Sequence, residues 1–290
     1  MQSVSAVDMR YNERDLERLH KELYRILAEI IRVCEVLDIP YFIQGGSAIG
    51  ALYYKGIIPW DDDIDIGMMR ADYERFLREA PAHLAPEYFL EWFGSEPNTP
   101  FYFAKVKRNN TLFVEEIWRH LDIHHGIFVD IFPYDRIPDN ALLEKLHRAE
   151  AKFWINCFMA KEVWLWSHCG ACQIDKPLPK SWISCAAIRC VTSLLSRKRI
   201  YRIMNSVLGR YNSCNTRQVN IVRMPKDQIL RANIEHSVKS EFGGMMVSLP
   251  RNVEEYLRHH YPNLRPTLPV EEQINHAPYK LSFDTTEQEQ

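Results

Sequence analysis

The acidic run in the segment PWDDDIDIGM, residues 59–68, constrains the fold of this chain more than any other feature. Aspartate is a poor strand former and neighbouring carboxylates repel, yet two isoleucines alternate with the last aspartates of the run. Side chains on a strand alternate between its two faces. We therefore predict a strand within residues 57–69, with Asp61, Asp63 and Asp65 on one face and the isoleucines on the other.

Three carboxylates on one face of a strand require a compensating positive charge. A divalent cation supplies it, and a ligand set made only of oxygen atoms is typical of Mg²⁺ or Mn²⁺. The alternative is a solvated acidic loop, the usual role of a run of like charges. Such loops are seldom interleaved with isoleucine, so the pattern favours a metal site.

A glycine pair lies upstream of the acidic run and directly follows a short aromatic, β-branched strand at residues 41–43. Paired glycines let backbone N–H groups approach a phosphate, and the N-terminus of a helix adds positive potential. Gly45, Gly46 and Ser47 are therefore candidate phosphate-binding residues, and Ser47 is expected to cap a short helix. Lys55 can deliver a positive charge to the same phosphate, although an ordinary surface lysine is the alternative.

The remaining pattern mixes helices and strands. Leucines and isoleucines recurring at three- and four-residue steps predict a helix over residues 13–38. Asn109-Asn110 is typical of a hairpin turn, and Pro133 and Pro138 are expected to break the chain. The other expected elements are helices at 71–80, within 140–212 and at 253–259, and strands at 88–93, 101–107, 111–116 and 126–132. This order indicates an α/β (α+β) fold, with one catalytic core and a helical elaboration.

Composition narrows the classes of function. The 36 basic and 38 acidic residues give a formal charge of −2, which argues against nucleic-acid binding over a whole surface. The first ten residues lack the apolar core of a secretory signal, and seven scattered cysteines are typical of a reduced cytoplasmic protein. His168, Cys169 and Cys172 resemble half of a zinc site, but no second pair completes it, so free thiols are expected.

Membrane contact is expected to be peripheral at most. The sequence contains no apolar stretch of the roughly 18 residues that a spanning helix needs. A basic stretch from Arg197 to Arg210 is expected to be a solvated helix face, with contact to anionic lipid head groups as the alternative. We expect a cytoplasmic protein that can act at the inner face of the membrane.

The segment GGSAIGALYYKGIIPWDDDIDIGMMRADYERFL, residues 45–77, resembles the signature of the LicD family. That family is similar to the DNA polymerase β-like nucleotidyltransferases, whose pattern is a Gly-Gly/Ser turn followed by Asp-x-Asp on a strand. The resemblance continues in FAKVKRNNT and HHGIFVDIFPYDRIP and covers residues 20–138 well. A weaker similarity within 240–280 lies in FGGMMVSLPRNVEEYLRHHY and His276, where Pro262-Asn263 replaces the Gly-Asp of many relatives.

The superfamily pattern implies a third carboxylate on a neighbouring strand. Asp130 is the candidate because it interrupts an otherwise apolar strand, where a charge is costly unless it is paired or bound to a metal. The alternative is a buried aspartate that is paired with an arginine or caps a turn, and Asp135, which is nearer a turn, is expected to be structural. The resemblance implies that Asp63, Asp65 and Asp130 are catalytic and metal-binding. The implied substrate-binding residues are Gly45, Gly46, Ser47, Lys55, Trp60 and Asp61.

The resemblance also implies a reaction. LicD-family proteins transfer phosphocholine from CDP-choline to a sugar of a cell-surface glycan, and relatives with a similar core transfer ribitol phosphate from CDP-ribitol. The implied donor is a CDP-activated alcohol, the cofactor Mg²⁺ or Mn²⁺, and the acceptor a capsular, lipopolysaccharide or teichoic acid glycan, which can be lipid-linked. Choline would need an aromatic cage, and its candidates are Trp60, Tyr53, Tyr54, Trp92 and Trp118. Two alternatives are a nucleotidyltransferase acting on a small molecule or an RNA, and an inactive binding scaffold.

We expect residues 1–290 to form a single catalytic domain with three parts. These are a nucleotidyltransferase-like core at 20–138, a helical, aromatic-rich insertion at 139–230, and a C-terminal segment at 231–290 that closes on the core. The insertion is expected to form the acceptor side of the cleft, because aromatic faces stack on sugar rings. Its aromatic residues are Phe153, Trp154, Phe158, Trp164, Trp166 and Trp182. The alternative is a plain helical core packed behind the sheet.

Overall fold

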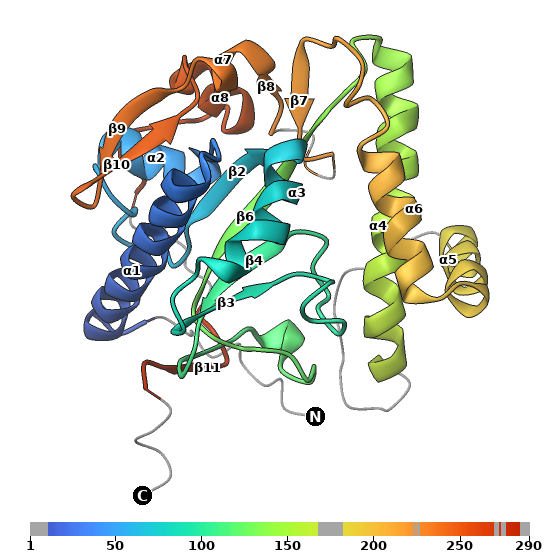
Figure 1. Ribbon diagram of the computed structural model, residues 1–290, viewed down its shortest axis with the longest axis horizontal. Coiled ribbons are helices and arrows are strands. Elements are labelled where there is room, and N and C mark those ends of the chain that lie inside the picture. The colour runs from blue at the N-terminus through green and yellow to red at the C-terminus, as the bar shows by residue number, and fades with distance from the viewer. Residues whose placement is uncertain are drawn as a thin grey trace, which may run out of the picture.

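A mixed β-sheet occupies the centre of the computed structural model of this chain (Figure 1). The structure describes residues 11–167, 182–222, 224, 227–269, 273 and 277–284, with the backbone alone for 162–167 and 182–184. The sheet order is β1-β2-β6-β4-β3, and β7 and β8 extend it from β6. Its strands are β1 (Phe42–Ile43), β2 (Asp65–Met69), β3 (Tyr88–Glu91), β4 (Ala104–Arg108), β6 (Phe128–Arg136), β7 (Gln218–Asn220) and β8 (Ile229–Leu230). The expected mixed α/β fold is confirmed.

The pairing of β2 with β6 is parallel, whereas β4 pairs with β6 in antiparallel fashion. We predicted that Pro133 would break the chain, but β6 continues through it. The reason is its position in the ladder. The Asp130 N–H points toward β2, so by alternation the missing N–H of Pro133 would point toward β4, whose pairing with β6 has ended at Ile131.

Eight helices in the described part of the chain surround the sheet: α1 (Glu13–Leu37), α2 (Gly45–Tyr53), α3 (Arg70–Glu79), α4 (Ala141–Ser167), α5 (Trp182–Leu194), α6 (Arg197–Leu208), α7 (Arg231–Glu235) and α8 (Val253–His260). The expected α1 is confirmed. Asn12 accepts a hydrogen bond from the Asp15 N–H at its start, and Asp38 ends it in the left-handed conformation. Its apolar stripe packs against β4 and β6, while α3 packs against β2 and β6.

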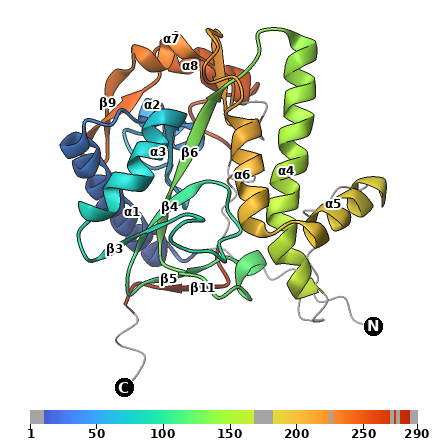
Figure 2. The ribbon, with the colours of Figure 1, turned by 45° about the vertical axis from the view of Figure 1, so that its right-hand side comes forward.

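The helices α4, α5 and α6 stand together beside the sheet (Figure 2). Phe158 of α4 is fully buried and meets Phe93 edge to face, with 5.4 Å between the ring centroids. Its expected role on an acceptor surface is therefore wrong, and Phe158 belongs to the core. The side chains of Trp164, Trp166 and Trp182 lie outside the described residues.

Two small sheets complete the fold. A hairpin is formed by β9 (Val238–Phe242) and β10 (Met245–Leu249), and β5 (Leu112–Val114) pairs with β11 (Lys280–Ser282). The hairpin expected around Asn109-Asn110 is wrong. Asn110 does take a left-handed turn conformation, but β5 leaves β4 to pair with the C-terminal strand. Two short 3₁₀ helices lie at Ala80–Ala82 and Glu116–Trp118.

Candidate active site

Asp65 and Asp130 lie directly beside each other on the parallel strands β2 and β6. Paired residues on neighbouring strands are separated by about 4.8 Å and point to the same face of the sheet. The two carboxylates are thus held side by side by rigid strands. The structure therefore brings together two of the three carboxylates expected to bind metal, although they lie far apart in the sequence.

The acidic run itself departs from the predicted strand. Because β2 begins only at Asp65, Asp61 and Asp63 precede the strand, and the predicted two-residue alternation over the whole run is wrong. Asp61, Asp62 and Asp63 instead gather their carboxylates, with one oxygen of each within 4.8 Å of the others. Asp62 is buried and accepts a hydrogen bond from the Tyr11 hydroxyl (2.9 Å). A site made only of carboxylate oxygens fits a hard divalent cation.

The start of α2 lies against these carboxylates. A Cβ atom added to Gly45 would lie 3.5 Å from Asp65 Oδ2, and one added to Gly46 would lie 3.1 Å from Asp61 Oδ2. Gly45 has a φ of +55°, a conformation that favours glycine. The glycine pair thus brings the N-terminus of α2 directly to the acidic run, where it can face an anionic group.

Ser47 has a different role from the one predicted. The N-cap of α2 is Gln44, so Ser47 lies inside the helix and the expectation that it caps the helix is wrong. Its buried hydroxyl accepts a hydrogen bond from the Asp65 N–H (2.9 Å). Ser47 therefore ties the helix to the first residue of β2 and fixes the backbone that carries Asp65.

The C-terminal segment also contacts the start of α2. The Gly45 N–H donates to the Tyr256 hydroxyl of α8 (3.0 Å), and the Tyr134 hydroxyl donates to the side chain of Gln44. We did not single out Tyr256 or Tyr134 from the sequence. The signal that could have found Tyr256 is its place in the weak C-terminal similarity, RNVEEYLRHHY.

Burial raises the pKa values of the carboxylates at this site, and neighbouring carboxylates add to the rise at Asp63 and Asp65. Burial, with Asp61, Asp62 and Asp130 nearby, holds the pKa of Asp63 well above its ordinary value. Burial, Asp63 and Asp130 do the same to the pKa of Asp65. Burial raises the pKa of Asp130 to about 6, although a neighbouring lysine opposes the rise. This accumulation of negative charge is what a bound cation would relieve.

That lysine, Lys105 of β4, is a residue we missed. Its Nζ lies 2.9 Å from Asp130 Oδ1, so the buried aspartate does have a basic partner, although not the arginine that we considered. A lysine inside the apolar segment FAKVK was the signal that could have found it. Asp135 has an arginine partner in Arg70, with Nη2 2.5 Å from Oδ2, and it lies within β6 rather than near a turn.

Lys55 points to a different neighbour. Its side chain is 74 % exposed, and its Nζ lies 3.4 Å from Glu241 of the β9–β10 hairpin. The structure therefore does not pair Lys55 with the acidic run, and its contact with a donor phosphate stays a prediction.

A cavity of about 420 Å³ opens beside Gly46 and Asp61. Trp60 and Tyr54 line it and meet edge to face, with 5.9 Å between ring centroids, and Tyr261 joins them from the C-terminal segment. Among the cage candidates, Trp118 is instead buried with Phe101 and Leu121. The structure thus places two of the five aromatic residues next to the acidic run.

Other features lie apart from this site. Cys169 and Cys172 fall outside the described residues, and Cys34, Cys157, Cys185, Cys190 and Cys214 are free thiols. Where the structure describes the chain, none of the helices is long and apolar enough to cross a membrane.

Known proteins are similar to this chain over the segment that contains the candidate active site. The model of the LicD/FKTN/FKRP nucleotidyltransferase domain matches residues 38–165, which include the glycine pair, the acidic run, Lys105 and Asp130. Over these residues the chain is similar to the LicD family. The lipopolysaccharide cholinephosphotransferase LicD of Haemophilus influenzae is 32 % identical over 134 residues, 42 % of this chain and 46 % of the relative.

Two further relatives are similar to this chain over shorter stretches. An uncharacterized protein of Rickettsia typhi is 35 % identical over 126 residues, 43 % of this chain and 38 % of its own length. The human ribitol 5-phosphate transferase FKRP is 40 % identical over 43 residues, 15 % of this chain and 9 % of its own length. The matched stretch therefore spans less than half of each of these curated relatives.

Proposed function

We propose that this chain is a metal-dependent transferase that moves phosphocholine from CDP-choline to a sugar of a cell-surface glycan. The observation that carries the proposal is the gathering of Asp61, Asp63, Asp65 and Asp130 at the glycine-rich start of α2. The similar proteins support the reaction class, since one is named a cholinephosphotransferase and another a ribitol 5-phosphate transferase. The shared chemistry is transfer of a phosphorylated alcohol.

The residues present fit Mg²⁺ or Mn²⁺. Asp63, Asp65 and Asp130 would hold the ion, and the oxygens of Asp61 and Asp62 lie close enough to those of Asp63 to share in binding it. Burial, and then the neighbouring carboxylates, raise the pKa values of Asp63 and Asp65, a rise that a bound cation would oppose. When bound, such an ion neutralises charge on the phosphates of the donor.

The protein residues would bind and orient the donor, and one of them would accept a proton from the acceptor hydroxyl. The N-terminus of α2 at Gly46 faces the diphosphate of the donor with its positive end. The acceptor hydroxyl attacks the phosphorus bonded to choline, the bond from that phosphorus to the bridging oxygen breaks, and CMP leaves. Asp130, buried beside Asp65, would accept the hydroxyl proton as a general base.

The cavity beside Asp61 is our candidate for the alcohol. Trp60, Tyr54 and Tyr261 offer aromatic surface, and Asp61 offers a carboxylate at the edge of the cavity. A quaternary ammonium group is attracted both to aromatic faces and to a negative charge. The aromatic surface and the Asp61 carboxylate suit choline better than an uncharged polyol, although Arg265 also lines the cavity.

The test is CMP release by the purified full chain. CDP-choline and CDP-ribitol are supplied separately with Mg²⁺, with and without a glycan acceptor, and Asp63→Asn and EDTA serve as controls. We expect CMP from CDP-choline in a metal-dependent reaction that the acceptor accelerates. Transfer of a nucleotide from a nucleoside triphosphate, with no CMP from any CDP-alcohol, would favour the nucleotidyltransferase alternative.

The proposed function also includes the acceptor and the place in the cell where the reaction occurs. We propose a glycan acceptor, lipid-linked or free, that is modified on the cytoplasmic side at the inner face of the membrane. Comparing acceleration by lipid-linked and by free glycan in the CMP assay tests this part.

A further inference from the structure

The sheet face that carries Asp65 and Asp130 continues as a row of charged residues across four strands. In register, Asp65 of β2 lies beside Asp130 of β6, Asp130 beside Lys105 of β4, and Lys105 beside Glu91 of β3. Paired residues share a face, so this row holds three carboxylates and one ammonium group, which lies between Asp130 and Glu91. Lys105 is the member that separates the candidate active site from the rest of the row.

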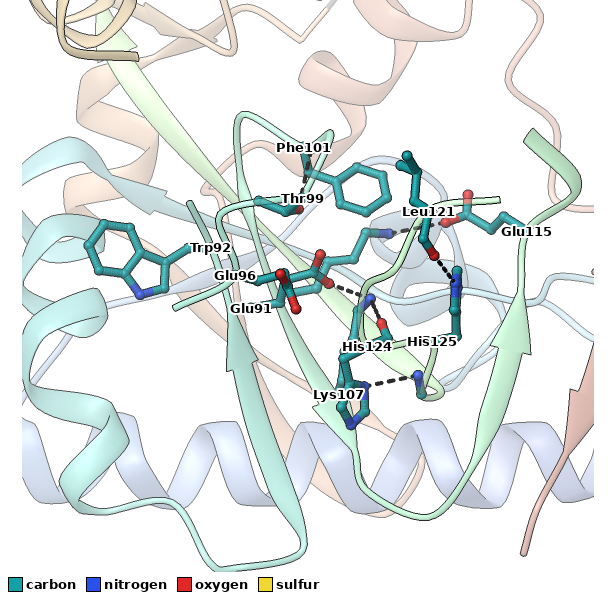
Figure 3. Close-up of polar contacts among 12 residues, drawn as sticks. Glu91, Trp92, Glu96, Thr99, Phe101, Lys107, Glu115, Leu121, His124 and His125 are labelled. Carbon is teal, nitrogen blue, oxygen red and sulfur yellow. Dashed lines mark hydrogen bonds and ion pairs between the residues drawn. The ribbon is translucent and has the colours of Figure 1, made fainter. Parts of the chain in front are cut away.

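Lys105 is fixed from several sides. It is 2 % exposed, and its Nζ lies 2.9 Å from Asp130 Oδ1 and 3.8 Å from Glu115 Oε2. The same atom lies 3.3 Å from the ring centroid of Phe128 and 4.3 Å from that of Phe101, which cover it with aromatic surface. Figure 3 shows Phe101 and Glu115 above this part of the sheet. Carboxylates and aromatic faces together stabilise a buried ammonium group.

The position of Lys105 excludes direct contact with a substrate. The Asp130 side chain retains 12 % of its exposed surface, whereas the Lys105 side chain retains 3 %. Lys105 therefore approaches Asp130 from the protein interior, on the side opposite to Asp65. An effect of Lys105 on the reaction has to pass through Asp130.

We propose that Lys105 is a positioning residue, which holds the Asp130 carboxylate beside Asp65 so that both can bind one divalent cation. The inference rests on the proposed function for the role of the metal, but not for the identity of the substrate. Without Lys105, the buried Asp130 carboxylate would face the negative charge of Asp65 with no fixed partner. It would then turn away from Asp65 and be lost as a metal ligand.

The experiment measures Mn²⁺ affinity of the full chain by calorimetry, together with steady-state CMP release. Groups that orient metal ligands typically contribute about 10- to 100-fold to metal affinity or activity, and we expect a loss of that size in Lys105→Met. The loss should appear in kcat, with the KM for the CDP donor changed by less than about threefold, because Lys105 does not touch the donor. If Lys105→Met does not fold, Lys105→Gln replaces it.

A neighbouring pair supplies the matched control. Lys107 lies two residues along β4, is 3 % exposed, and forms a buried ion pair with Glu91 and a hydrogen bond to the His124 carbonyl (Figure 3). The double variant Lys107→Met with Glu91→Gln removes a similar buried ion pair whose direct contacts are with each other and with the His124 carbonyl rather than with Asp130. Its Mn²⁺ affinity should stay within about twofold of wild type, whatever its stability.

A double-mutant cycle tests whether Lys105 affects Mn²⁺ binding through Asp130. If Lys105 acts through Asp130, Lys105→Met should not weaken Mn²⁺ binding further in a chain that already carries Asp130→Asn. Three results would overturn the proposal: unchanged or tighter Mn²⁺ binding by Lys105→Met, an equal loss in the Lys107 control, or a full additional loss on top of Asp130→Asn. A wild-type chain that binds Mn²⁺ but leaves CDP-choline intact would instead refute the proposed substrate, and one that binds no Mn²⁺ would refute the metal-dependent function.

Discussion

At the scale of single residues, Asp63 links metal binding to stability. Its pKa is raised by burial and by neighbouring carboxylates, so the charged form is costly in the folded state. Such a group stabilises the fold below its unfolded pKa of about 3.9, and that contribution is lost as pH rises through the folded pKa. At pH 7 without metal, Asp63→Asn should therefore be at least as stable as wild type, and it should have no turnover.

Urea unfolding in EDTA at pH 4 and at pH 7, together with CMP release in Mg²⁺, checks this prediction. The stability of Asp63→Asn relative to wild type should be greater at pH 7 than at pH 4. Asp65→Asn and Asp130→Asn should also abolish turnover. Wild-type rates in EDTA, or an active Asp63→Asn protein, would contradict the assignment of the metal-binding carboxylates.

Trp60 is expected to select the alcohol. A cation–π contact contributes about 0.5–2 kcal/mol, so Trp60→Ala should raise the KM for CDP-choline by about 2- to 30-fold. The KM for CDP-ribitol, which carries no cation, should change less. Initial rates with both donors provide the measurement, and an equal loss for both would remove Trp60 from choline recognition.

At the scale of elements, the start of α2 controls how closely the helix approaches the acidic run. A Cβ at Gly46 would lie 3.1 Å from Asp61 Oδ2, so Gly46→Ala must displace that carboxylate by a few tenths of an ångström. The backbone of Gly46 has no positive φ, so we expect little loss of stability. Since small displacements of positioned groups have large kinetic effects, kcat should fall by roughly tenfold or more.

Gly50 of the same helix supplies a contrast. A Cβ there would lie 2.3 Å from the Gly56 carbonyl oxygen, which is backbone and cannot move freely. Gly50→Ala should therefore lower the midpoint of thermal unfolding, whereas Gly46→Ala should mainly lower kcat. If Gly46→Ala loses stability but keeps wild-type kcat, the close contact with Asp61 has no role in the reaction.

At the scale of the whole molecule, Arg70 connects three parts of the fold. From the start of α3 it forms two hydrogen bonds with Asp135 of β6 and one with Asn205 of α6 (3.2 Å), while Asn212 also donates to Asp135 (2.7 Å). Removing one partner of a buried pair leaves an uncompensated charge. Arg70→Met should therefore lower the free energy of unfolding by about 3–5 kcal/mol.

Replacing both Arg70 and Asp135 separates the loss of stability caused by an unpaired charge from the loss caused by packing. Arg70→Met with Asp135→Leu leaves no unpaired charge and should recover part of the stability that Arg70→Met loses. Mn²⁺ affinity should be unchanged in the folded double variant, because this pair is separate from the acidic run. Urea unfolding monitored by fluorescence tests the first expectation, and calorimetry tests the second.

Local sequence patterns were sufficient to predict many of the elements and candidate site residues of this protein. The periodicity of α1, the glycine pair before a helix, the acidic run and the strand around Asp130 each depend on residues close together in the sequence. Steric preferences and the alternation of polar and apolar positions act over such short distances. The sequence alone therefore determined the mixed fold, the family resemblance and the carboxylates to examine.

Strand register and the contacts between distant segments could be determined only from the tertiary structure. The partner of Asp130 is Lys105 because β4 and β6 pair in one particular register, and the Gly45 N–H meets Tyr256 from 211 residues away. Likewise, β5 pairs with β11 rather than β4, which no turn signal at Asn110 could indicate. Such contacts depend on how whole strands and helices pack, and a shift of one residue would turn every side chain of a strand to the opposite face. Only the folded chain decides which charges meet.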